Sequence, residues 1–570
     1  MTTSIGNTVL MGLAVWVGCA GISAAQTINV DVLNSQQGFN RAVFGQNTHA
    51  SAYFSEGYDA AYNKYLNLLN GTSERGPAGG MFADSYDWRI RETAFGAQLP
   101  GGGTAHGEST LDYLRHARDH NALPIITVNE HGFGQATGNG YEVNYTNTDT
   151  NMLKQLAADW VRYTNHILQT YRQGDVITDP EDLRVLNSIS WPGADYTSDK
   201  LLAPGEAPVP AVKYWEIGNE VNFRADQGDT GDLYRARYNA ITTAMAAQDN
   251  TIKVGPNVTG RFQSGENTAR DYIKALLKPV NNNWEKVDFI SYHPYDSTIL
   301  GANEDHAAAV AALENLRSRQ ESMRTWTKDQ INQNFGSLFF PKYYPTRNSV
   351  ELLATEWNPS TYDNAYAKRQ WNALGVVDTA MYFAEKGLSA ANFWIWAANI
   401  YNGAENPQYK AFEALTKYGG DTLVSSYQYE NSRLYITRNS QTGALTVWGM
   451  NFLFGDPGDQ PVTMHLSLNN LGIDLNQYQI TLMRLADLTG PTTLFSSGTG
   501  GNVNFVPDVG WINTDMTGMN LQSFDFTINP AELQLLVIQP VPEPGTIGVL
   551  IGGVALMALK RRPCRQNRQP

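Results

Sequence analysis

The sequence predicts an α/β protein in which a (β/α)8 TIM barrel is followed by an all-β sandwich domain. Its 570 residues are too many for one ordinary domain, so two folded units are expected. From Gln26 to about Tyr418, apolar strand-like runs alternate with helical patterns, which is typical of a parallel sheet with crossover helices. After Gly419, short β-rich runs recur between turn residues without helices, which favours a β-sandwich. We therefore expect the barrel over residues 41–418 and the sandwich over residues 419–540.

The barrel strands are predicted from short apolar runs that helical patterns separate. Strand–helix units repeated over this length fit a (β/α)8 barrel with long insertions. The eight predicted strands are Ala42–Thr48, a Gly-rich segment near Arg75–Phe82, Leu123–Asn129, Val212–Glu220, Ile252–Asn257, Val287–Tyr295, Leu352–Trp357 and Ala391–Trp396.

The segments between these strands carry helical patterns. Between the third and fourth strands, apolar residues from Leu153 to Tyr171 recur at helical spacing and would form one face. Glu304–Asn334 and Asn364–Lys386 are long and mostly polar with one apolar stripe, as expected of helices on the outside of a barrel. The Pro-, Gly- and Asp-rich segment Asp175–Pro210 is predicted to overhang the rim just before the fourth strand.

The sandwich is predicted from β-rich runs between turn segments such as GDPGDQ (455–460) and GTGGN (498–502). Residues Ile28–Leu33 also alternate, so we expect residues 26–40 to add an N-terminal strand to the sandwich before the barrel begins. The predicted strands after residue 419 are Leu434–Arg438, Leu445–Phe452, Val462–Leu468, Gln479–Leu485, Val503–Phe505, Phe524–Ile528 and Leu533–Ile538.

Residues 1–25 have the composition of a secretory signal peptide. An apolar run from Val9 to Ile22 is followed by Ser23-Ala24-Ala25, a small-residue cleavage site before Gln26. No Lys or Arg precedes the apolar run. An uncleaved anchor helix is the alternative, although the run is short for a membrane span.

Residues 541–570 combine Pro542-Glu543-Pro544, an apolar segment Ile547–Leu559 and the basic Lys560-Arg561-Arg562. This arrangement resembles the bacterial PEP-CTERM sorting signal. The resemblance implies export to the cell surface or extracellular matrix of a Gram-negative-type bacterium, with an exosortase-like enzyme as partner. The cations would stay on the cytoplasmic side, so the chain would touch a membrane only through this short transmembrane segment. A plain C-terminal anchor is the alternative.

Composition excludes some classes of function. Cys19 and Cys564 lie in the terminal segments, so a trimmed chain has no disulfide, thiol nucleophile or cysteine metal site. The formal net charge of −14 at pH 7 argues against nucleic acid and anionic membrane surfaces as partners. The sequence has no HxH or HExxH metal motif, and we expect no cofactor.

The segment Lys213–Phe223 (KYWEIGNEVNF) predicts the first catalytic group. It has the pattern of a buried strand that ends in Gly-Asn-Glu, and alternation would place Glu216, Gly218 and Glu220 on one face and Asn219 on the other. In a parallel barrel, active sites form at the carboxyl ends of the strands. We therefore predict that Glu220 is catalytic and that Glu216, four residues deeper, is a paired structural carboxylate.

A second acidic strand tip is Glu356, which ends the seventh predicted strand and precedes the loop opener Asn358-Pro359. The fourth and seventh strands end across the barrel mouth from each other. Two carboxyl groups about 5–5.5 Å apart allow one to act as nucleophile and the other as acid and then base. The nucleophile must stay ionised, while burial and its neighbour raise the pKa of the acid.

The two tips, Gly218-Asn219-Glu220 and Thr355-Glu356-Trp357, resemble the acid/base and nucleophile motifs of clan A retaining glycoside hydrolases, which are (β/α)8 barrels. Within this clan, the chain looks most like the α-L-arabinofuranosidase-like family. Residues 77–88 after the second strand, residues 124–129 and the trailing sandwich add to the resemblance, which covers most of residues 40–540. It implies double displacement through a glycosyl–enzyme intermediate, without a cofactor.

The resemblance also implies individual roles. Glu220 would be the acid/base and Glu356 the nucleophile, and Asn219 would hydrogen-bond the sugar 2-hydroxyl. His293, at the end of the sixth strand, would hold the nucleophile carboxylate in place, and Arg75 would keep its pKa low. The alternative for His293 is a hydrogen-bonded histidine of the core, and the alternative for Arg75 is an ion-pair partner in the core. The predicted substrate-binding residues are Asn219, Arg75, His293, Tyr295, the apolar Trp394 and Trp396, and the rim residue Glu130.

The chain departs from the family pattern in the pocket around these tips. The first strand ends in Gln46-Asn47-Thr48-His49 where arabinofuranosidases carry Glu, and Met81 follows the Gly pair where they carry Asn. In that family these positions contact the sugar, so the resemblance does not select one substrate for this chain. Plant or microbial polysaccharides or oligosaccharides are the expected substrates. The alternatives are β-xylosidase, endo-β-glucanase or β-glucuronidase activity, or a non-catalytic surface protein that binds polysaccharide.

Overall fold

The computed structural model describes residues 26–47, 65–77, 83, 86–93, 109–131, 149–191, 199–259, 265–278, 285–294, 317–318, 321–322, 324–327, 329, 350–358, 370–394, 407–429, 431–453, 460–487, 509–530 and 532–541.

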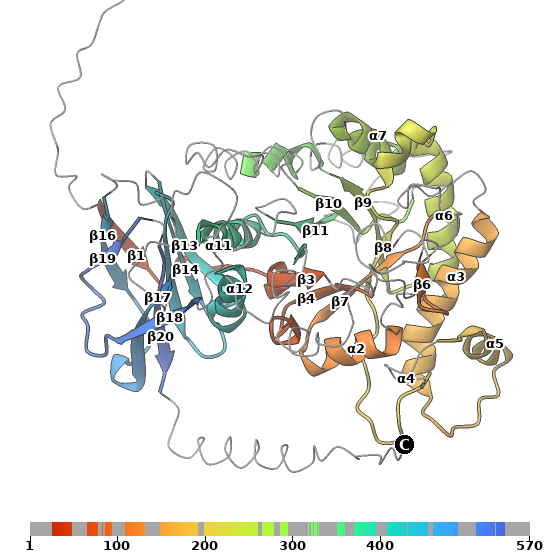
Figure 1. The fold of residues 1–570 in the computed structure, drawn as a ribbon, viewed down its shortest axis with the longest axis horizontal. Helices are drawn as coiled ribbons and strands as arrows, with labels where there is room; N and C mark the ends of the chain where they lie inside the picture. The colour runs from red at the N-terminus through yellow and green to blue at the C-terminus, as the bar shows by residue number, and fades with distance from the viewer. Residues whose placement is uncertain are drawn as a thin grey trace, which may run out of the picture.

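Eight parallel strands close into a barrel, which confirms the predicted fold (Figure 1). The order around the barrel follows the chain, so β8 and β11 are the fourth and seventh strands, the ranks predicted for the two acidic tips. The strands are β3 (Gly45–Asn47), β4 (Ser73–Gly76), β7 (Leu123–Val128), β8 (Tyr214–Ile217), β9 (Lys253–Thr259), β10 (Phe289–His293), β11 (Glu351–Trp357) and β12 (Ala390–Phe393). A two-stranded ribbon of β5 (Tyr86–Asp87) and β6 (Glu92–Thr93) follows β4.

The first and last barrel strands are shorter than the sequence predicts. Arg41–Phe44 forms a 3-10 helix, η1, because the side chain of Asn40 accepts a hydrogen bond from the N–H of Ala42. The first strand therefore begins at Gly45, where a Cβ atom would lie 2.0 Å from the Oγ of Ser73. The eighth strand ends at Phe393 instead of continuing to residue 396.

Helices cover the outside of the barrel, and four of them begin at a capping side chain. Ser109, Asp149, Asp179 and Thr230 each accept a hydrogen bond from a backbone N–H in the first turn of α2, α3, α5 and α6. The helices are α2 (Thr110–Asp119), α3 (Thr150–Arg162), the π-helical η3 (Tyr163–Ile167), α4 (Leu168–Thr170), α5 (Pro180–Ser188), the 3-10 helix η4 (Val221–Gln227), α6 (Gly231–Gln248), α7 (Gly265–Leu277), α11 (Gln370–Glu385) and α12 (Pro407–Tyr418).

The apolar face predicted between the third and fourth strands is confirmed along α3, η3 and α4. Leu153, Leu156, Trp160 and Ile167 are buried against the barrel. The helix widens into one π-helical turn at η3, which keeps the apolar side chains after Trp160 on the buried side.

Helix α11 differs from the predicted polar outer helix with one apolar stripe. The side chains from Ala373 to Ala384 are all buried, because the helix lies between the barrel and the sandwich (Figure 1). The carboxylate of Asp378 accepts a hydrogen bond of 2.9 Å from the hydroxyl of Tyr435 in the sandwich, and it pairs with Arg317. A helix that is covered on two sides carries apolar residues around most of its circumference.

The described parts of the segment Asp175–Pro210 (residues 175–191 and 199–210) lie beside the ribbon that follows β4 and beside α2: the N–H of Ser190 donates to the carbonyl of Arg89 at 2.8 Å. The segment leads into the amino end of β8, which is the end of the barrel opposite the rim that carries Glu220. Glu206 in this segment pairs with Arg115 and Arg118 of α2. Residues 192–198 lie outside the described ranges, so the overhang at the rim stays a prediction.

Two sheets form the C-terminal sandwich, with strand orders β18-β17-β20-β15-β14-β13-β2 and β1-β16-β19. The predicted N-terminal strand is confirmed: β1 runs parallel to β16, with Ile28 opposite Leu466. The sequence did not predict β13 and β18. The bounds are β1 (Gln26–Asp31), β2 (Gln37–Gly38), β13 (Thr422–Tyr429), β14 (Ser432–Arg438), β15 (Leu445–Asn451), β16 (Val462–Asn469), η6 (Leu475–Gln477), β17 (Tyr478–Asp487), β18 (Val509–Asp515), β19 (Phe524–Ile528) and β20 (Leu533–Pro540).

The larger sheet of the sandwich is a middle layer that is buried on both faces. Leu434 and Ile436 of β14 pack toward the three-stranded sheet, in one cluster with Leu466 of β16. Tyr435, which lies between them on β14, and Trp448 of β15 belong to the core that continues into the barrel. The barrel and the sandwich therefore share an apolar core.

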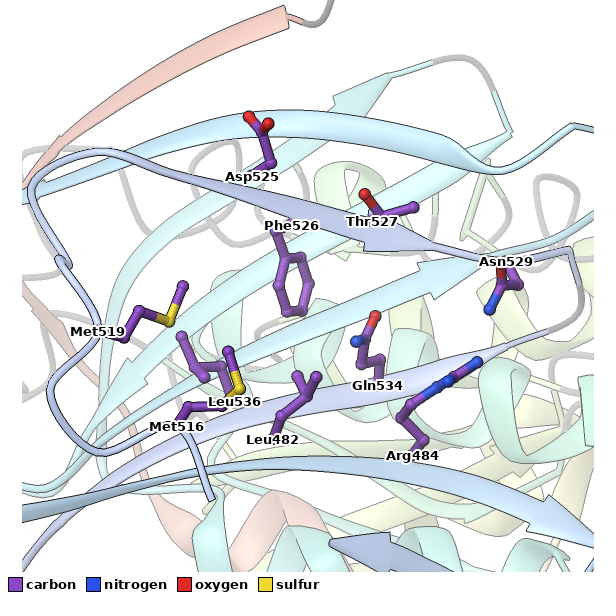
Figure 2. Close-up of a pocket in the computed structure, with 10 residues that line it drawn as sticks. All are labelled: Leu482, Arg484, Met516, Met519, Asp525, Phe526, Thr527, Asn529, Gln534 and Leu536. Atoms are coloured by element: carbon purple, nitrogen blue, oxygen red, sulfur yellow. The ribbon is translucent and has the colours of Figure 1, made fainter. Parts of the chain in front are cut away.

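A cavity of about 310 Å³ lies in the sandwich beside the edge strand β19 (Figure 2). It is in the C-terminal domain, whereas the acidic tips lie at the ends of barrel strands, so the cavity is separate from the catalytic candidates. Its lining residues are Leu482, Arg484, Met516, Met519, Asp525, Phe526, Thr527, Asn529, Gln534 and Leu536.

Some predictions fall outside the described ranges. These are the signal peptide, the sorting signal beyond Val541, the strand Val503–Phe505 and most of the helix Glu304–Asn334. Within the described ranges, none of the helices has the length and apolar character needed to span a bilayer.

Candidate active site

The chain turns sharply between β8 and the first acidic tip. Gly218 has a φ of +84° and Glu220 a φ of +48°, both in the left-handed region. This turn breaks the alternation of the strand, and the side chains of Glu216 and Asn219 both contact Arg75. The prediction that Asn219 lies on the opposite face from Glu216 is therefore wrong.

A β-bulge shapes the second acidic tip. The pairing of β11 with β12 shifts register just before Trp357. As a result, the adjacent side chains of Thr355 and Glu356 both point into the barrel, where Thr355 contacts Asn257 and Glu356 contacts Arg75. Trp357 then points outward into an aromatic cluster. Bulges commonly re-aim a side chain next to a functional site, and this one presents a carboxylate at the barrel mouth.

Arg75 is fully buried and joins the two tips from inside the barrel. Its Nε lies 2.5 Å from Oε2 of Glu216, and its Nη1 lies 2.7 Å from Oε1 of Glu356. Nη1 also donates to Oδ1 of Asn47 at 3.2 Å, and Nη2 donates to Oδ1 of Asn219 at 2.8 Å. One guanidinium thus holds residues from the first, fourth and seventh strands in a fixed arrangement.

Glu216 is the buried counter-ion of Arg75, as the sequence predicts. Burial by itself would raise the pKa of the Glu216 carboxyl, but the charge of Arg75 and hydrogen bonds from Ser291 and Thr355 outweigh burial and lower its pKa to about 2. Thr127 also donates to this carboxylate at 2.8 Å. Glu216 therefore stays ionised and acts as a structural group.

His293 lies between the two predicted catalytic carboxylates. Its Nδ1 is 2.9 Å from Oε1 of Glu220 and 3.5 Å from Oε2 of Glu356. An oxygen of each carboxylate and a ring nitrogen of the histidine all lie within 4.8 Å of one another. The side chain of Glu220 is 18% exposed and that of Glu356 is 4% exposed, so water reaches Glu220 more readily.

Burial raises the pKa of the Glu356 carboxyl above its usual range, and the neighbouring Glu220 adds to this shift. His293 and Arg75 act in the opposite direction and favour the ionised form of Glu356. Glu356 can therefore serve as a carboxylate only because two cationic or hydrogen-bond-donating groups lie beside it.

Among the described residues, one group of side chains has ligand atoms close enough together to hold a metal ion: Glu220, His293 and Glu356. Arg75 already places a positive charge 2.7 Å from Glu356. A divalent cation at the three side chains would lie close to this charge and be repelled by it. The donor set therefore suits proton chemistry better than metal binding.

The other predicted site residues take varied positions. Glu130 is fully buried, and it is paired with Arg237 and His131 beneath the rim. Trp394 directly follows β12 and is 7% exposed, and its backbone carbonyl accepts a hydrogen bond from the side chain of Asn358. Tyr295 and Trp396 lie outside the described residues. The roles of these residues in substrate binding stay predictions.

The structure adds residues that the sequence did not single out as site residues. Asn47 accepts from Arg75, and Asn257 contacts Glu216 and His293. A polar residue at the end of a predicted barrel strand is the signal that would have found them. Both occupy such ends, and their side chains face the barrel interior.

No protein-family model matches the sequence, and no curated protein matches it in sequence. Solved structures do share its fold. An α-L-arabinofuranosidase from Thermotoga maritima in an arabinose complex is 17% identical, with a TM-score of 0.59, and the alignment covers 90% of this chain and 99% of that chain. A xyloglucanase of glycoside hydrolase family 44 from Paenibacillus polymyxa is 13% identical, with a TM-score of 0.56 and coverage of 90% and 99%.

A third neighbour is CelM2, a bifunctional glucanase-xylanase protein from a metagenome library. It is 16% identical to this chain, with a TM-score of 0.54, and the alignment covers 91% of this chain and 99% of that chain. These structural neighbours are glycoside hydrolases, and at such low identity the likeness establishes the shared fold, a barrel followed by a β-sandwich.

Proposed function

We propose that this chain is a retaining O-glycoside hydrolase that cleaves polysaccharide or oligosaccharide by double displacement. The observation that carries the proposal is the arrangement of Glu220 and Glu356 at the carboxyl ends of the fourth and seventh barrel strands. One oxygen of Glu220 lies within 4.8 Å of one oxygen of Glu356, with His293 between them. A short separation favours retention, because inverting enzymes need roughly 6.5–9.5 Å to admit a water between the carboxyl groups.

Glu356 is the better candidate for the nucleophile. It is the more buried of the two carboxylates, and Arg75 contacts it directly and favours its ionised form. Glu220 is paired with His293 and is the more exposed of the two carboxylates, so water and a leaving group can approach it. It suits the acid/base role, which alternates between two protonation states.

In the proposed first step, a carboxylate oxygen of Glu356 forms a bond to the anomeric carbon as the glycosidic bond breaks, and Glu220 gives its proton to the departing oxygen. In the second step, Glu220 removes a proton from water, and the water oxygen displaces Glu356 from the same carbon. Atoms and charges balance without a cofactor, and the anomeric configuration is retained.

The substrate is proposed from resemblance. The motifs at the two tips look most like those of α-L-arabinofuranosidases, and one structural neighbour is an arabinofuranosidase. Two other neighbours are named a glucanase-xylanase and a xyloglucanase, so β-xyloside and β-glucan substrates stay in the proposal as alternatives. Gln46, which stands where arabinofuranosidases carry Glu, is fully buried on β3.

Export is a separate proposal that rests on the two terminal sequence motifs. Expression in a bacterium with an exosortase, followed by fractionation, tests it. The full chain is expected at the cell surface, and a chain without residues 541–570 is expected in the periplasm or medium. Retention of both forms in the cytoplasm would contradict export.

The test of the catalytic proposal is a panel of chromogenic glycosides offered to residues 26–540. The wild-type chain is expected to release the chromophore from at least one α-L-arabinofuranoside, β-xyloside or β-glucoside. Glu356→Gly is expected to lose this activity and to recover part of it with azide, which can enter the vacated nucleophile position. Full activity in Glu356→Gly would exclude the mechanism.

Product stereochemistry is the second test. NMR of the first product formed on the responding glycoside is expected to show the anomer of the substrate. Appearance of the opposite anomer would show inversion and would exclude a covalent intermediate on Glu356.

A further inference from the structure

Asn257 lies on β9, inside the barrel, and is fully buried between the two acidic tips. Its Oδ1 accepts a hydrogen bond of 2.8 Å from the backbone N–H of Glu220. Its Nδ2 lies 2.9 Å from Nε2 of His293 and 3.0 Å from Oε1 of Glu216. One amide side chain therefore contacts the main chain of the proposed acid/base and the histidine that lies between both carboxylates.

The chemistry of these contacts fixes the orientation of the amide. A backbone N–H can only donate, so Oδ1 of Asn257 must face Glu220 and Nδ2 must face His293. An amide nitrogen only donates, and its two hydrogens face His293, Glu216 and the hydroxyls of Ser291 and Thr355, each hydroxyl 2.9 Å from Nδ2. Where one of these hydrogens goes to His293, Nε2 acts as the acceptor. The proton of the neutral imidazole then sits on Nδ1, which is 2.9 Å from Glu220 and 3.5 Å from Glu356.

The backbone contact matters because Glu220 has an unusual conformation. A φ of +48° is uncommon for a residue other than glycine, asparagine or aspartate, and it persists where surrounding contacts hold it. The hydrogen bond from Asn257 is such a contact, and the N–H of Phe223 also bonds the carbonyl of Glu220 at 2.9 Å. Together they determine where the Glu220 carboxyl points.

We propose that Asn257 is a positioning residue that fixes, with one side chain, the backbone of Glu220 and the Nδ1–H tautomer of His293. In this state the imidazole donates its proton toward the two carboxylates and holds them at a short separation. The proposal rests on the proposed glycosidase function, since its purpose is to aim the acid/base. It makes no claim about the sugar.

Two substitutions separate the two contacts. Asn257→Asp keeps an oxygen that accepts from the N–H of Glu220, but it replaces the donor that faces His293. Asn257→Ala removes both contacts and avoids placing a new charge beside Glu216. Asn165→Ala is the matched control, because Oδ1 of Asn165 likewise accepts from a backbone N–H, that of Val212 at 2.8 Å, and its Nδ2 donates to the carbonyl of Val212 at 2.9 Å, at the amino end of the barrel.

The kinetic test compares a glycoside with a poor leaving group, which needs protonation, and its dinitrophenyl counterpart, which does not. Asn257→Ala is expected to lose on the order of 10²-fold in kcat on the poor leaving group, because misplacing a catalytic group costs about this much. The loss on the dinitrophenyl glycoside is expected to be below tenfold, and Asn165→Ala is expected to change both rates equally. An equal loss on both substrates in Asn257→Ala would overturn the proposal, since a structural defect acts on both.

The tautomer test does not need activity, so it separates failure of this proposal from failure of the proposed function. In the full chain labelled with 15N-histidine, with His293→Gln to assign the signal, wild-type His293 is expected to carry its proton on Nδ1 at neutral pH. Asn257→Asp is expected to move a proton onto Nε2, and Asn165→Ala is expected to leave the signal unchanged. A wild-type His293 protonated on Nε2 would overturn the proposal even if the enzyme were active.

Discussion

At the scale of single residues, the site is organised by Arg75. This fully buried guanidinium neutralises Glu216, a permanent carboxylate, and Glu356, whose carboxyl is otherwise pushed toward its neutral form by burial. Burial of charge is costly unless each charge has a partner. Removing Arg75 would therefore affect both the stability of the fold and the ionisation of Glu356.

Arg75→Met is expected to lower the free energy of unfolding by about 3–5 kcal/mol, because it leaves buried carboxylates without their counter-charge. Urea unfolding at pH 7 measures this loss. Arg75→Met combined with Glu216→Gln is expected to recover part of it, since the permanent carboxylate is then neutral. A loss below about 1 kcal/mol, the scale of an exposed ion pair, would show that the pair is not buried in solution.

The stability of the protein is expected to fall in acid partly through Glu216. Its pKa in the folded protein, about 2, lies below the unfolded value of about 4.3, so its stabilisation is present above the unfolded value and is lost as the pH falls toward 2. Glu356 has the opposite sign, because its raised pKa means that the folded state gains stability when this group is neutral. Urea midpoints measured between pH 6 and about 2 should fall less steeply in Glu216→Gln than in wild type. Parallel curves would contradict the assignment.

The acid limb of the activity profile is expected to report Glu356. Catalysis requires this carboxylate ionised, and its pKa is raised, so kcat/KM should decline below a pH that lies above the usual glutamate value of about 4.3. Glu220→Gln removes a charge that raises this pKa, so it should move the limb to lower pH. The comparison uses a dinitrophenyl glycoside, which needs no acid. An unchanged limb would show that another group controls it.

The sequence predicted the residues proposed to take part in the reaction better than the residues that position them. Glu220, Glu356 and His293 end predicted strands within recognisable motifs, and the structure brings all three together. Asn257 and Asn47 are single asparagines at strand ends, a pattern that also opens ordinary turns. Only the three-dimensional arrangement shows that their side chains face the barrel interior.

At the scale of the element, both tips depend on departures from regular strand geometry. The β8 tip turns through Gly218, where a Cβ atom would lie 2.5 Å from Cγ1 of Val221, and the β11 tip contains a bulge. The two-residue alternation of side chains along a regular strand predicts neither departure. For this reason it placed Asn219 on the wrong face of the strand. Helix α11 was mispredicted for a related reason, since its second contact surface belongs to a domain that follows it in the chain.

Gly218→Ala is expected to reduce kcat by about 10²-fold, because the added methyl group must displace the turn that carries Glu220. Gly174→Ala is the control: Gly174 has a φ of +89°, similar to the +84° of Gly218, but a Cβ atom there would meet no atom within 4 Å. Both variants carry the same backbone penalty of roughly 1 kcal/mol. Thermal unfolding should show a larger loss of stability in Gly218→Ala than in Gly174→Ala, because only the first methyl group has a close neighbour. Steady-state kinetics should show the loss of kcat in Gly218→Ala alone, and equal activity would refute the steric argument.

At the scale of the whole molecule, the barrel and the sandwich share a buried apolar core, so we expect them to unfold as one cooperative unit. Helix α11 is buried between them, and Asp378 on this helix bonds the hydroxyl of Tyr435 in the sandwich. The sequence predicts two domains because alternating strand and helix patterns give way to short β-rich runs near residue 419. It does not reveal the shared core, because apolar residues on both faces of β14 and β15 are also expected of a sheet in any buried layer.

Tyr435→Phe is expected to destabilise the barrel although the residue belongs to the sandwich. The change leaves buried Asp378 without one of its donors, which costs about 1–3 kcal/mol. Loss of activity on heating should shift by the same amount as loss of circular dichroism, in one transition. Thr463→Ala removes a hydroxyl from an exposed pair in the same sandwich and should change neither. Two separate transitions would show independent domains.

The pairing of β1 with β16 dictates the order in which the sandwich can be completed. A chain that emerges from the ribosome amino end first presents Ile28 and Val30 long before their partner strand exists. The whole barrel is synthesised while β1 waits, and the final pairing closes a very long loop, which makes it a late and slow step. During that interval β1 is an unpaired apolar strand, so it is the segment that a holding chaperone has the longest time to bind.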